Sequence, residues 1–444
     1  MLDRLLAPPS PPPTAVPTDR EEPTSAGIEQ PERPDIDAHA PADVDDPIDV
    51  RDLLRRYTVE ELSEAADLYY RDNIDALEYF FAKPAWNVDE APDLLACFAQ
   101  VLAGVRPLRG MRVLDFGAGP GWTSRFLTQL GCEVVVCDVS ATALDVSRQL
   151  FARQPVAGTQ PTPTFLHFDG RHLDLPDESI DRIICIDAFH HVPNPKAVLG
   201  ELGRVLRPGG IAGFQEPGPS HSTAAQSQYE MKNFTVIEND IRMRDISGWA
   251  SDAGFTSLKL AIFTPEPFHT SIDLYEDYLG HGVTVEQHYE HQRRFVQNRR
   301  VFFLSRGAPV VSDSRERNGL VADLRVNPDS LAAARGSLVR VQLTARNIGT
   351  SVWLPSDAPV GPVLVGSHLY AADGHLLERD HSRFPLPGAG GSGVAPGEQI
   401  IFDTELPVPD APGDYTVEID LVSELVCWFE FNETIPATLR LRVT

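Results

Sequence analysis

Three glycines alternate along the chain directly after an apolar run that ends in an acidic residue, and few folds accommodate this arrangement. The acid is Asp115, and the glycines are Gly117, Gly119 and Gly121. A backbone without side chains can turn sharply here and let a ligand approach closely. Apolar residues at helical spacing follow, so the free N–H groups of a helix N-terminus face the same place. The pattern predicts a ligand site at the carboxyl end of a parallel strand.

The glycine spacing differs from the Gly-x-Gly-x-x-Gly fingerprint of nicotinamide and flavin sites, which would require a glycine at Trp122. A second short apolar run, residues 132–137, ends in Asp138, seventeen residues beyond Gly121. A carboxylate at that strand end can accept hydrogen bonds from ribose hydroxyls. Together the loop and Asp138 predict a site for a nucleoside cofactor.

Five segments in order resemble the class I S-adenosylmethionine-dependent methyltransferases of the small-molecule type with a His-His pair, across residues 60–307. Besides the glycine loop and the second strand they are 168–171, 181–192 and 202–210. The resemblance implies S-adenosyl-L-methionine as cofactor. The cofactor-binding residues that it implies are Asp115, Gly117, Ala118, Gly119, Gly121, Asp138, Val139, Asp169, Gly170, Arg171 and Asp187.

Within this resemblance, the first motif would hold the methionine end of the cofactor. Asp138 would bind the ribose, and Asp169 would bind the exocyclic amine of adenine. An N-terminal helix, announced by a capping-box pair at Thr58 and Glu61, would fold over the cofactor. We expect Tyr69 and Tyr70 of this helix either to line the site or to pack in the core.

Alternating strands and helices from Arg112 onward predict an α/β fold with a doubly wound, mostly parallel seven-stranded sheet. The resemblance implies that the last strand inserts antiparallel. The longer insertion 265–298 is rich in Tyr and His and is a candidate substrate lid. The expected strands are 111–116, 133–137, 164–168, 182–187, 210–215, 257–263 and 300–305, and the expected helices are 121–130, 141–153, 196–206 and 243–253.

Composition divides the chain into four parts. Pro and acidic residues dominate 1–48, which predicts a disordered tail because such a segment buries little apolar surface. Residues 49–310 form the methyltransferase domain with its helical cap, and 311–318 form a polar linker. Short β-branched runs separated by Pro/Gly turns in 319–444 predict an all-β sandwich.

The sandwich carries a resemblance of its own. Residues 347–353 (Asn-Ile-Gly-Thr-Ser-Val-Trp) and 412–415 (Pro-Gly-Asp-Tyr) resemble turns of immunoglobulin-like sandwiches appended to bacterial cell-surface polysaccharide enzymes. This resemblance implies a saccharide acceptor. Such a domain could bind glycan or form a homo-oligomer.

Methylation of an alcohol requires a general base, and histidine is the usual choice near neutral pH. Of the His-His pair we expect His191 to lie nearer the substrate and His190 to pack against cofactor or core. Glu216, at the end of the fifth strand, either faces the cleft as a base or supports another residue. His221 lies in a glycine-rich loop, where it either acts on the substrate or faces solvent.

The sequence also contains candidate ligands for a metal ion. Asp187, Glu216, Asn239 and Asp240 could gather around a divalent cation, but nothing in their spacing forces this arrangement, so we expect no metal. The five cysteines form no Cys-x-x-Cys pair, which favours reduced thiols.

The net charge of −26 disfavours nucleic-acid substrates and anionic membranes, since both are bound through Lys and Arg. No apolar run is long enough for a membrane span, and we expect a cytoplasmic protein without membrane insertion. The sequence therefore predicts an enzyme that O-methylates a sugar hydroxyl during cell-surface polysaccharide or glycoconjugate synthesis. Methylation of a natural product, quinone or amine, and a non-catalytic carbohydrate-binding scaffold, stay open as alternatives.

Overall fold

A computed structural model of the chain describes residues 47–308, 312–387 and 393–444, so the predicted tail 1–48 falls almost wholly outside the described residues. The first described elements are helical. The predicted capping box is confirmed, because Thr58 Oγ1 accepts from the Glu61 N–H and the Glu61 carboxylate accepts from the Thr58 N–H. The N-terminal helices are α1 (Val50–Arg56), α2 (Val59–Asp72), α3 (Leu77–Ala82) and α4 (Ala91–Val105).

A seven-stranded sheet follows, in the order β3-β2-β1-β4-β5-β7-β6. Strands β1 to β5 run parallel, and β7 pairs antiparallel with both β5 and β6, as predicted for the last strand. The strands are β1 (Arg112–Phe116), β2 (Glu133–Asp138), β3 (Thr164–His167), β4 (Ile180–Ile186), β5 (Leu206–Pro217), β6 (Ser257–Leu260) and β7 (Arg299–Ser305).

All seven strands fall at the predicted places, and the differences are at their ends. Strand β5 begins earlier than residue 210 because Leu206 already pairs with Ile180, ahead of an irregularity in the register. Strand β6 ends at Leu260 rather than at residue 263.

Helices cover both faces of this sheet, as a doubly wound fold requires. Along β1, Val113 belongs to an apolar cluster with α4 and α5, whereas Leu114 belongs to a second cluster with α7 and α9. This alternation follows from the two-residue period of a strand. Besides α4, the covering helices are α5 (Trp122–Gln129), α6 (Ala141–Arg153), α7 (Pro195–Val205) and α9 (Met243–Asp252), whereas α8 (Ala225–Phe234) packs on α2.

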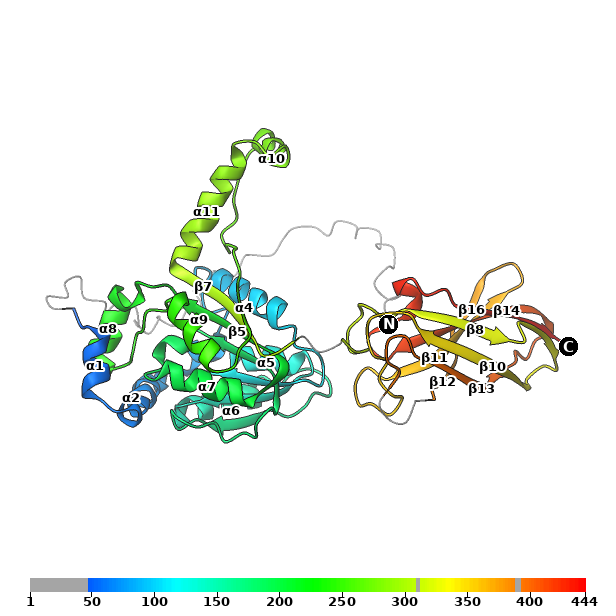
Figure 1. Ribbon diagram of the computed structural model, residues 1–444, viewed down its shortest axis with the longest axis horizontal. Coiled ribbons are helices and arrows are strands. Elements are labelled where there is room, and N and C mark those ends of the chain that lie inside the picture. The colour runs from blue at the N-terminus through cyan, green and yellow to red at the C-terminus, as the bar shows by residue number, and fades with distance from the viewer. Residues whose placement is uncertain (1–46, 309–311, 388–392) are drawn as a thin grey trace, which may run out of the picture. The chain divides into compact units, whose positions relative to one another are not determined.

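The insertion between β6 and β7 contains α10 (Ile272–Leu279) and α11 (Thr284–Asn298). Figure 1 shows these two helices as a hairpin that stands away from the sheet, with α11 leading back into β7.

The C-terminal region is all-β and consists of a three-stranded sheet, β13-β10-β8, and a six-stranded sheet, β12-β11-β14-β16-β9 with β15 beside β14. Inward-facing residues of both sheets share one apolar cluster, so the sheets pack face to face as a sandwich. The strands are β8 (Ala322–Asn327), β9 (Ser330–Ala333), β10 (Leu338–Asn347), β11 (Val363–Ala371), β12 (Leu376–Pro385), β13 (Gln399–Pro407), β14 (Gly413–Ser423), β15 (Cys427–Trp428) and β16 (Ala437–Val443).

The Asn-to-Trp turn of this region is well ordered by its own side chains. Asn347 Nδ2 donates to the carbonyls of Ser351 and Val394, both at 2.9 Å, and Trp353 is fully buried. The two sheets confirm the predicted sandwich, whereas the exact domain boundaries at 310 and 319 and the likeness to polysaccharide enzymes stay predictions.

The sandwich buries one carboxyl group that should make its stability depend on pH. Burial raises the pKa of Asp420 from 3.8 to about 7. The folded state therefore holds this proton more tightly than the unfolded chain, and stability falls as pH rises from about 4 to about 7, by roughly 4 kcal/mol at most. We expect Asp420→Asn to remove this decline. Calorimetric unfolding at pH 5 and pH 8 checks it, with the exposed Asp403→Asn as control; an unchanged pH dependence would contradict it.

Candidate active site

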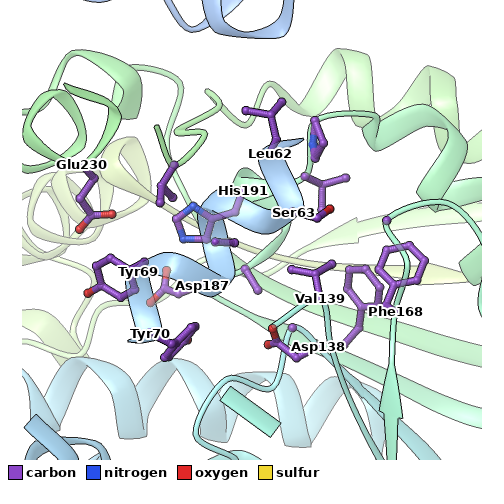
Figure 2. Close-up of a pocket in the computed structure, with 18 of the residues that line it drawn as sticks. Leu62, Ser63, Tyr69, Tyr70, Asp138, Val139, Phe168, Asp187, His191 and Glu230 are labelled. Atoms are coloured by element: carbon purple, nitrogen blue, oxygen red, sulfur yellow. The ribbon is translucent and has the colours of Figure 1, made fainter. Parts of the chain in front are cut away.

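A cavity of about 260 Å³ opens where the predicted cofactor site lies. Its wall combines the carboxyl ends of β1, β2 and β4 with side chains of α2 and α3. Figure 2 shows Asp138, Val139 and Phe168 on one side of the cavity and Tyr69 and Glu230 on the other, with His191 and Asp187 between them. The other lining residues are Leu62, Ser63, Ala66, Tyr70, Tyr79, Phe80, Lys83, Phe116, Gly117, Pro120, Gly170, Ala188, Val192, Pro193, Asn194 and Val236.

The glycine loop has the conformation that its composition predicts. Gly117, Gly119 and Gly121 all have positive φ, at +69°, +51° and +83°. A Cβ on Gly117 would lie 2.3 Å from Cβ of Ala188, and one on Gly119 would lie 2.8 Å from the Tyr70 hydroxyl. The loop therefore forms a cradle that side chains would fill. Gly117 lines the cavity, and Gly119 lies next to two lining residues, Tyr70 and Asp138, whereas Ala118 and Gly121 are not among the lining residues.

Asp115 does not line the cavity. Its buried carboxylate accepts hydrogen bonds from the hydroxyls of Thr123, at 2.6 Å, and Ser124, at 2.5 Å, in the first turn of α5. Burial raises its pKa to about 6. This geometry makes Asp115 a residue that fixes the glycine loop to α5, and contact with the methionine end of a cofactor stays a prediction.

Asp138 lies in the cavity wall where the sequence places it. One carboxylate oxygen accepts from the Gly119 N–H at 2.8 Å and the other from the Ser140 N–H at 2.9 Å. Burial raises the pKa of Asp138 in spite of these bonds. Each oxygen keeps a further lone pair, so a carboxylate here can accept from a ribose diol, beside Val139.

Only part of the segment 168–171, which was predicted to bind adenine, lines the cavity. Phe168 and Gly170 line the cavity, but Asp169 is exposed and its carboxylate accepts from the N–H groups of Arg171 and His172. The Arg171 guanidinium is paired with Glu60 of α2 at 2.6 Å. Arg171 is thus occupied in tying the loop to the helical cap, and neither Asp169 nor Arg171 lines the cavity described here.

Asp187 follows β4 with φ at +47° and lines the cavity. Its Oδ1 accepts from Gln215 Nε2 and Arg299 Nη1, both at 2.8 Å. Sequence reasoning missed the pairing with Arg299, which is 112 residues away. Arg299 comes within reach of Asp187 because β7 inserts antiparallel next to β5.

Of the His-His pair, only His191 lines the cavity, as expected. Its Nδ1 lies 2.8 Å from the Ile237 carbonyl, which can only accept, so Nδ1 carries the proton and Nε2 is free to accept one. Burial opposes protonation of His191, but the carboxylates of Glu238 and Glu230 outweigh it and raise the pKa.

Glu216 does not face the cleft, so its predicted role as a base is wrong for this structure, and the alternative that it supports another residue agrees with its contacts. It is fully buried behind the cavity and accepts from the N–H groups of Ala188, Phe189 and His190 and from Nδ1 of His190 at 2.7 Å. The backbone turn after β4 points its N–H groups at this strand end and captures the carboxylate. Glu216 is therefore a positioning residue for His190, which is itself buried.

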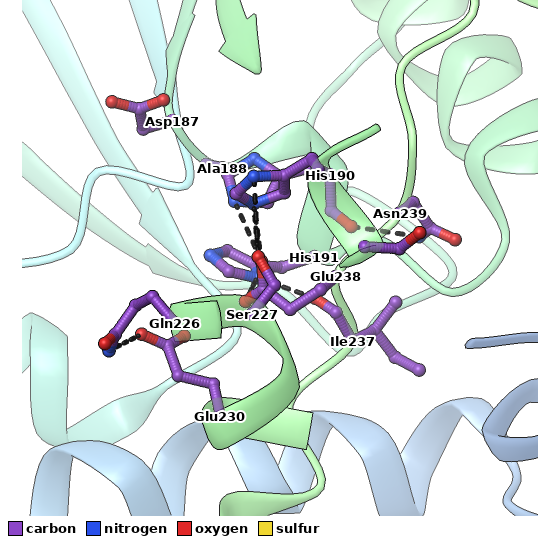
Figure 3. Close-up of polar contacts among 12 residues, drawn as sticks. Asp187, Ala188, His190, His191, Gln226, Ser227, Glu230, Ile237, Glu238 and Asn239 are labelled. Carbon is purple, nitrogen blue, oxygen red and sulfur yellow. Dashed lines mark hydrogen bonds and ion pairs between the residues drawn. The ribbon is translucent and has the colours of Figure 1, made fainter. Parts of the chain in front are cut away.

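His221 lies outside the cavity wall but not in open solvent. Its Nε2 is 2.6 Å from an oxygen of Glu238, a buried residue that sequence reasoning missed. Figure 3 shows Glu238 beside His190 and His191. The pKa of Glu238 is lowered to about 2, because His191 and His221 outweigh the effect of burial. Burial and repulsion from Glu238 raise the pKa of the neighbouring Glu230 to about 7.

Glu238 and Glu230 carried no signal in the sequence. Glu238 lies in the irregular segment after α8, where no periodicity assigns a direction to a side chain. The two histidines that contact Glu238, His191 and His221, are far from it in the sequence and gave no indication of this contact.

The metal ligands considered from the sequence do not gather. Glu216 binds His190, and Asp187 binds Arg299. Asn239 Nδ2 donates to the carbonyls of His190 and Val192, and Asp240 accepts from the Ser222 N–H. Each of these groups has a protein partner.

The insertion 265–298 contributes no residue to the cavity wall, so its predicted role as a wall is wrong for this structure. The aromatic wall comes instead from the N-terminal cap, where Tyr69, Tyr70, Tyr79 and Phe80 line the cavity. The alternative that Tyr69 and Tyr70 line the site is confirmed. The cysteines are free thiols, and no helix within the described ranges has the length and hydropathy to span a membrane.

Part of the chain is similar to known methyltransferases. Residues 114–214 match the family model of the methyltransferase domain. A demethylmenaquinone methyltransferase of Clavibacter sepedonicus is 36% identical over 116 residues, which are 26% of this chain and 45% of that protein. A ubiquinone biosynthesis O-methyltransferase of Alkalilimnicola ehrlichii is 27% identical over 219 residues, 47% of this chain and 83% of that protein.

Among solved structures, Haemonchus contortus phosphoethanolamine N-methyltransferase 2, in complex with phosphomonomethylethanolamine and S-adenosylhomocysteine, aligns with a TM-score of 0.41 and 18% identity, over 57% of this chain and 61% of that one. The chain spans less than half the length of the Clavibacter relative. Its residues 114–214 match a methyltransferase domain, which agrees with the predicted enzyme class and cofactor.

Proposed function

We propose that the chain transfers a methyl group from S-adenosyl-L-methionine to a hydroxyl group, and that this hydroxyl belongs to a sugar of a cell-surface polysaccharide or glycoconjugate. The observation that carries the proposal is His191, the histidine of the pair that lines the cavity, with Nε2 free to accept a proton. The bound cofactor supplies a reactive methyl group on a sulfonium, so the protein mainly has to bind, orient and exclude water.

Two ends of the cavity suggest how the ligands are arranged. Asp138, Val139 and Phe168 form one side, which suits a ribose and an adenine ring (Figure 2). Tyr69, His191 and Glu230 would form the acceptor end. There the hydroxyl donates its hydrogen to His191 Nε2 and gives up the proton as the new bond forms.

The sugar is proposed because a second, all-β domain follows the catalytic one and resembles accessory domains of polysaccharide enzymes. A second candidate has its own support. The cavity is lined by the rings of Tyr69, Tyr79 and Phe80, and two relatives are named for quinone methylation. The aromatic ring of a quinone precursor or of another phenolic natural product would stack on these rings and present its hydroxyl for methylation.

Methyl transfer can be tested directly on the full chain. We would incubate it with methyl-labelled cofactor and a panel of nucleotide sugars, lipid-linked saccharides, phenols and amines, and identify products by mass spectrometry. The proposal expects label on a saccharide oxygen. Label only on phenols would support the second candidate, and label only on amines would contradict O-methylation. Cofactor binding without any transfer would favour a carbohydrate-binding scaffold.

Asp138 should account for part of the cofactor affinity. Asp138→Ala removes the acceptor for the ribose hydroxyls and frees the Gly119 N–H, so we expect cofactor binding to weaken by ~1–3 kcal/mol, about 5- to 150-fold. Calorimetric titration with S-adenosylhomocysteine measures this loss. Asp145→Ala, in the exposed face of α6, is the matched control and should bind normally. Equal affinity of both variants would show that Asp138 does not contact the cofactor.

A further inference from the structure

Three side chains from separate loops meet behind the His191 wall of the cavity. They are His190 after β4, His221 after β5, and Glu238 after α8. One ligand atom of each lies within 4.8 Å of the others. His190 and Glu238 are buried, and His221 is mostly buried. Imidazole nitrogens and a carboxylate brought together in this way are the donor set of zinc and related transition metals.

The tautomer of His190 aims a lone pair into this group. Its Nδ1 lies 2.7 Å from Glu216, whose carboxylate already accepts three backbone N–H groups and can only accept. Nδ1 therefore donates, and Nε2 is left with a lone pair that faces Glu238 Oε2 at 3.9 Å. A carboxylate that holds the far nitrogen of a ligating histidine is the usual support of a metal site.

Glu238 supplies the second independent sign of a ligand. Its carboxylate is buried, and Oε1 accepts no hydrogen bond among the described residues. His191 Nδ1 is 3.3 Å from Oε1, but its proton is directed to the Ile237 carbonyl at 2.8 Å. His221 Nε2 lies 2.6 Å from Oε2 and compensates part of the charge, but the His190 lone pair also faces Oε2, and two acceptors that face each other favour a cation between them.

We propose that Nε2 of His190, Nε2 of His221 and the Glu238 carboxylate bind one divalent transition-metal ion of the zinc class. In a tetrahedral site with bonds of about 2.0–2.1 Å, ligand atoms lie about 3.3 Å apart. The pairs observed at 2.6 Å and 3.9 Å reach this spacing with side-chain adjustments of about 1 Å. Three protein ligands leave a fourth position for water. The site differs from the carboxylate set weighed in the sequence and shares no residue with it.

The metal would lie close to the acceptor end of the cavity, because its ligand His190 is next to His191 in the sequence and the centroids of their rings are 3.9 Å apart. It would hold the loops after β4 and β5 and the segment after α8 in fixed relation. This inference goes beyond the proposed function and does not depend on the identity of the acceptor.

The test measures metal directly on the full chain. We would strip the protein with a chelator, load it with Zn²⁺ or Co²⁺, remove the excess by dialysis and determine the metal by mass spectrometry. One equivalent per chain is expected, with visible Co²⁺ bands typical of a tetrahedral site. His221→Asn and Glu238→Gln should each retain less than a tenth of it. His172→Asn is the matched control, a histidine also paired with a glutamate, Glu201, and should keep the full equivalent.

Folding is checked in the same samples. His221 does not line the cavity, so His221→Asn should bind S-adenosylhomocysteine like the unmodified chain while losing the metal. Absence of stoichiometric metal in the unmodified chain would overturn the proposal. So would His221→Asn and Glu238→Gln variants that retain as much metal as the unmodified chain. Metal binding without methyl transfer would instead count against the proposed function and leave the metal site standing.

Discussion

Gly119→Val should abolish binding of S-adenosylmethionine while the catalytic domain stays folded. Gly119 has φ at +51°, where a β-branched residue is strained, and its Cβ would already lie 2.8 Å from the Tyr70 hydroxyl. The two further methyl groups of valine must enter the space between the loop and α2. A cofactor held against this backbone has no room beside them, so we expect affinity to fall by more than about 100-fold, which corresponds to about 3 kcal/mol.

The backbone strain that Gly119→Val adds to the folded chain is smaller than the expected loss of cofactor-binding free energy. A residue held in an unfavourable φ region costs about 1–3 kcal/mol, so a measurable fall in melting temperature is expected but not unfolding. Gly200→Val is the matched control, because a Cβ at Gly200 in α7 meets nothing within 4 Å. Calorimetric titration with S-adenosylhomocysteine should show normal binding for Gly200→Val. Comparable affinity for both variants would mean that the cofactor does not approach this loop.

The outcome at the glycine loop shows what strand order and turn chemistry can predict. Asp138 and Gly117 line the cavity because residues at the carboxyl ends of β1 and β2 must meet at one edge of a parallel sheet. The glycines could be assigned because positive φ is cheap only for glycine. Both inferences need only local sequence and a general rule of α/β topology. The antiparallel insertion of the last strand, in contrast, was expected only from the resemblance to the methyltransferase family.

Side-chain direction in the loops could not be predicted in this way. Glu216 ends β5 as expected, yet the backbone N–H groups of the turn after β4 draw its carboxylate inward, toward His190. Arg299 reaches Asp187 only because β7 inserts next to β5. Glu238 lies in a segment without regular structure. In each case a contact between distant parts of the chain decides the role of the residue.

His191→Ala should lower turnover by ~10²–10⁴-fold with nearly unchanged cofactor affinity, because general-base catalysis typically contributes this much. His191 lines the acceptor end, and its Nδ1 proton is held by the Ile237 carbonyl, which presents Nε2 to the substrate. Steady-state kinetics with the acceptor found in the labelling screen measure the effect, and His172→Ala, outside the cavity, is the control.

The dependence of turnover on His191 should also differ between a sugar hydroxyl, a phenol and an amine as acceptor. A sugar hydroxyl is a weak acid and needs a base in the transition state, so its methylation should depend strongly on His191. A phenol ionises far more readily, and an amine with a free lone pair needs no proton removed before it attacks. Unchanged turnover of His191→Ala on a sugar acceptor would therefore exclude His191 as the general base. It would not transfer the role to Glu216 or His221, because neither lines the cavity.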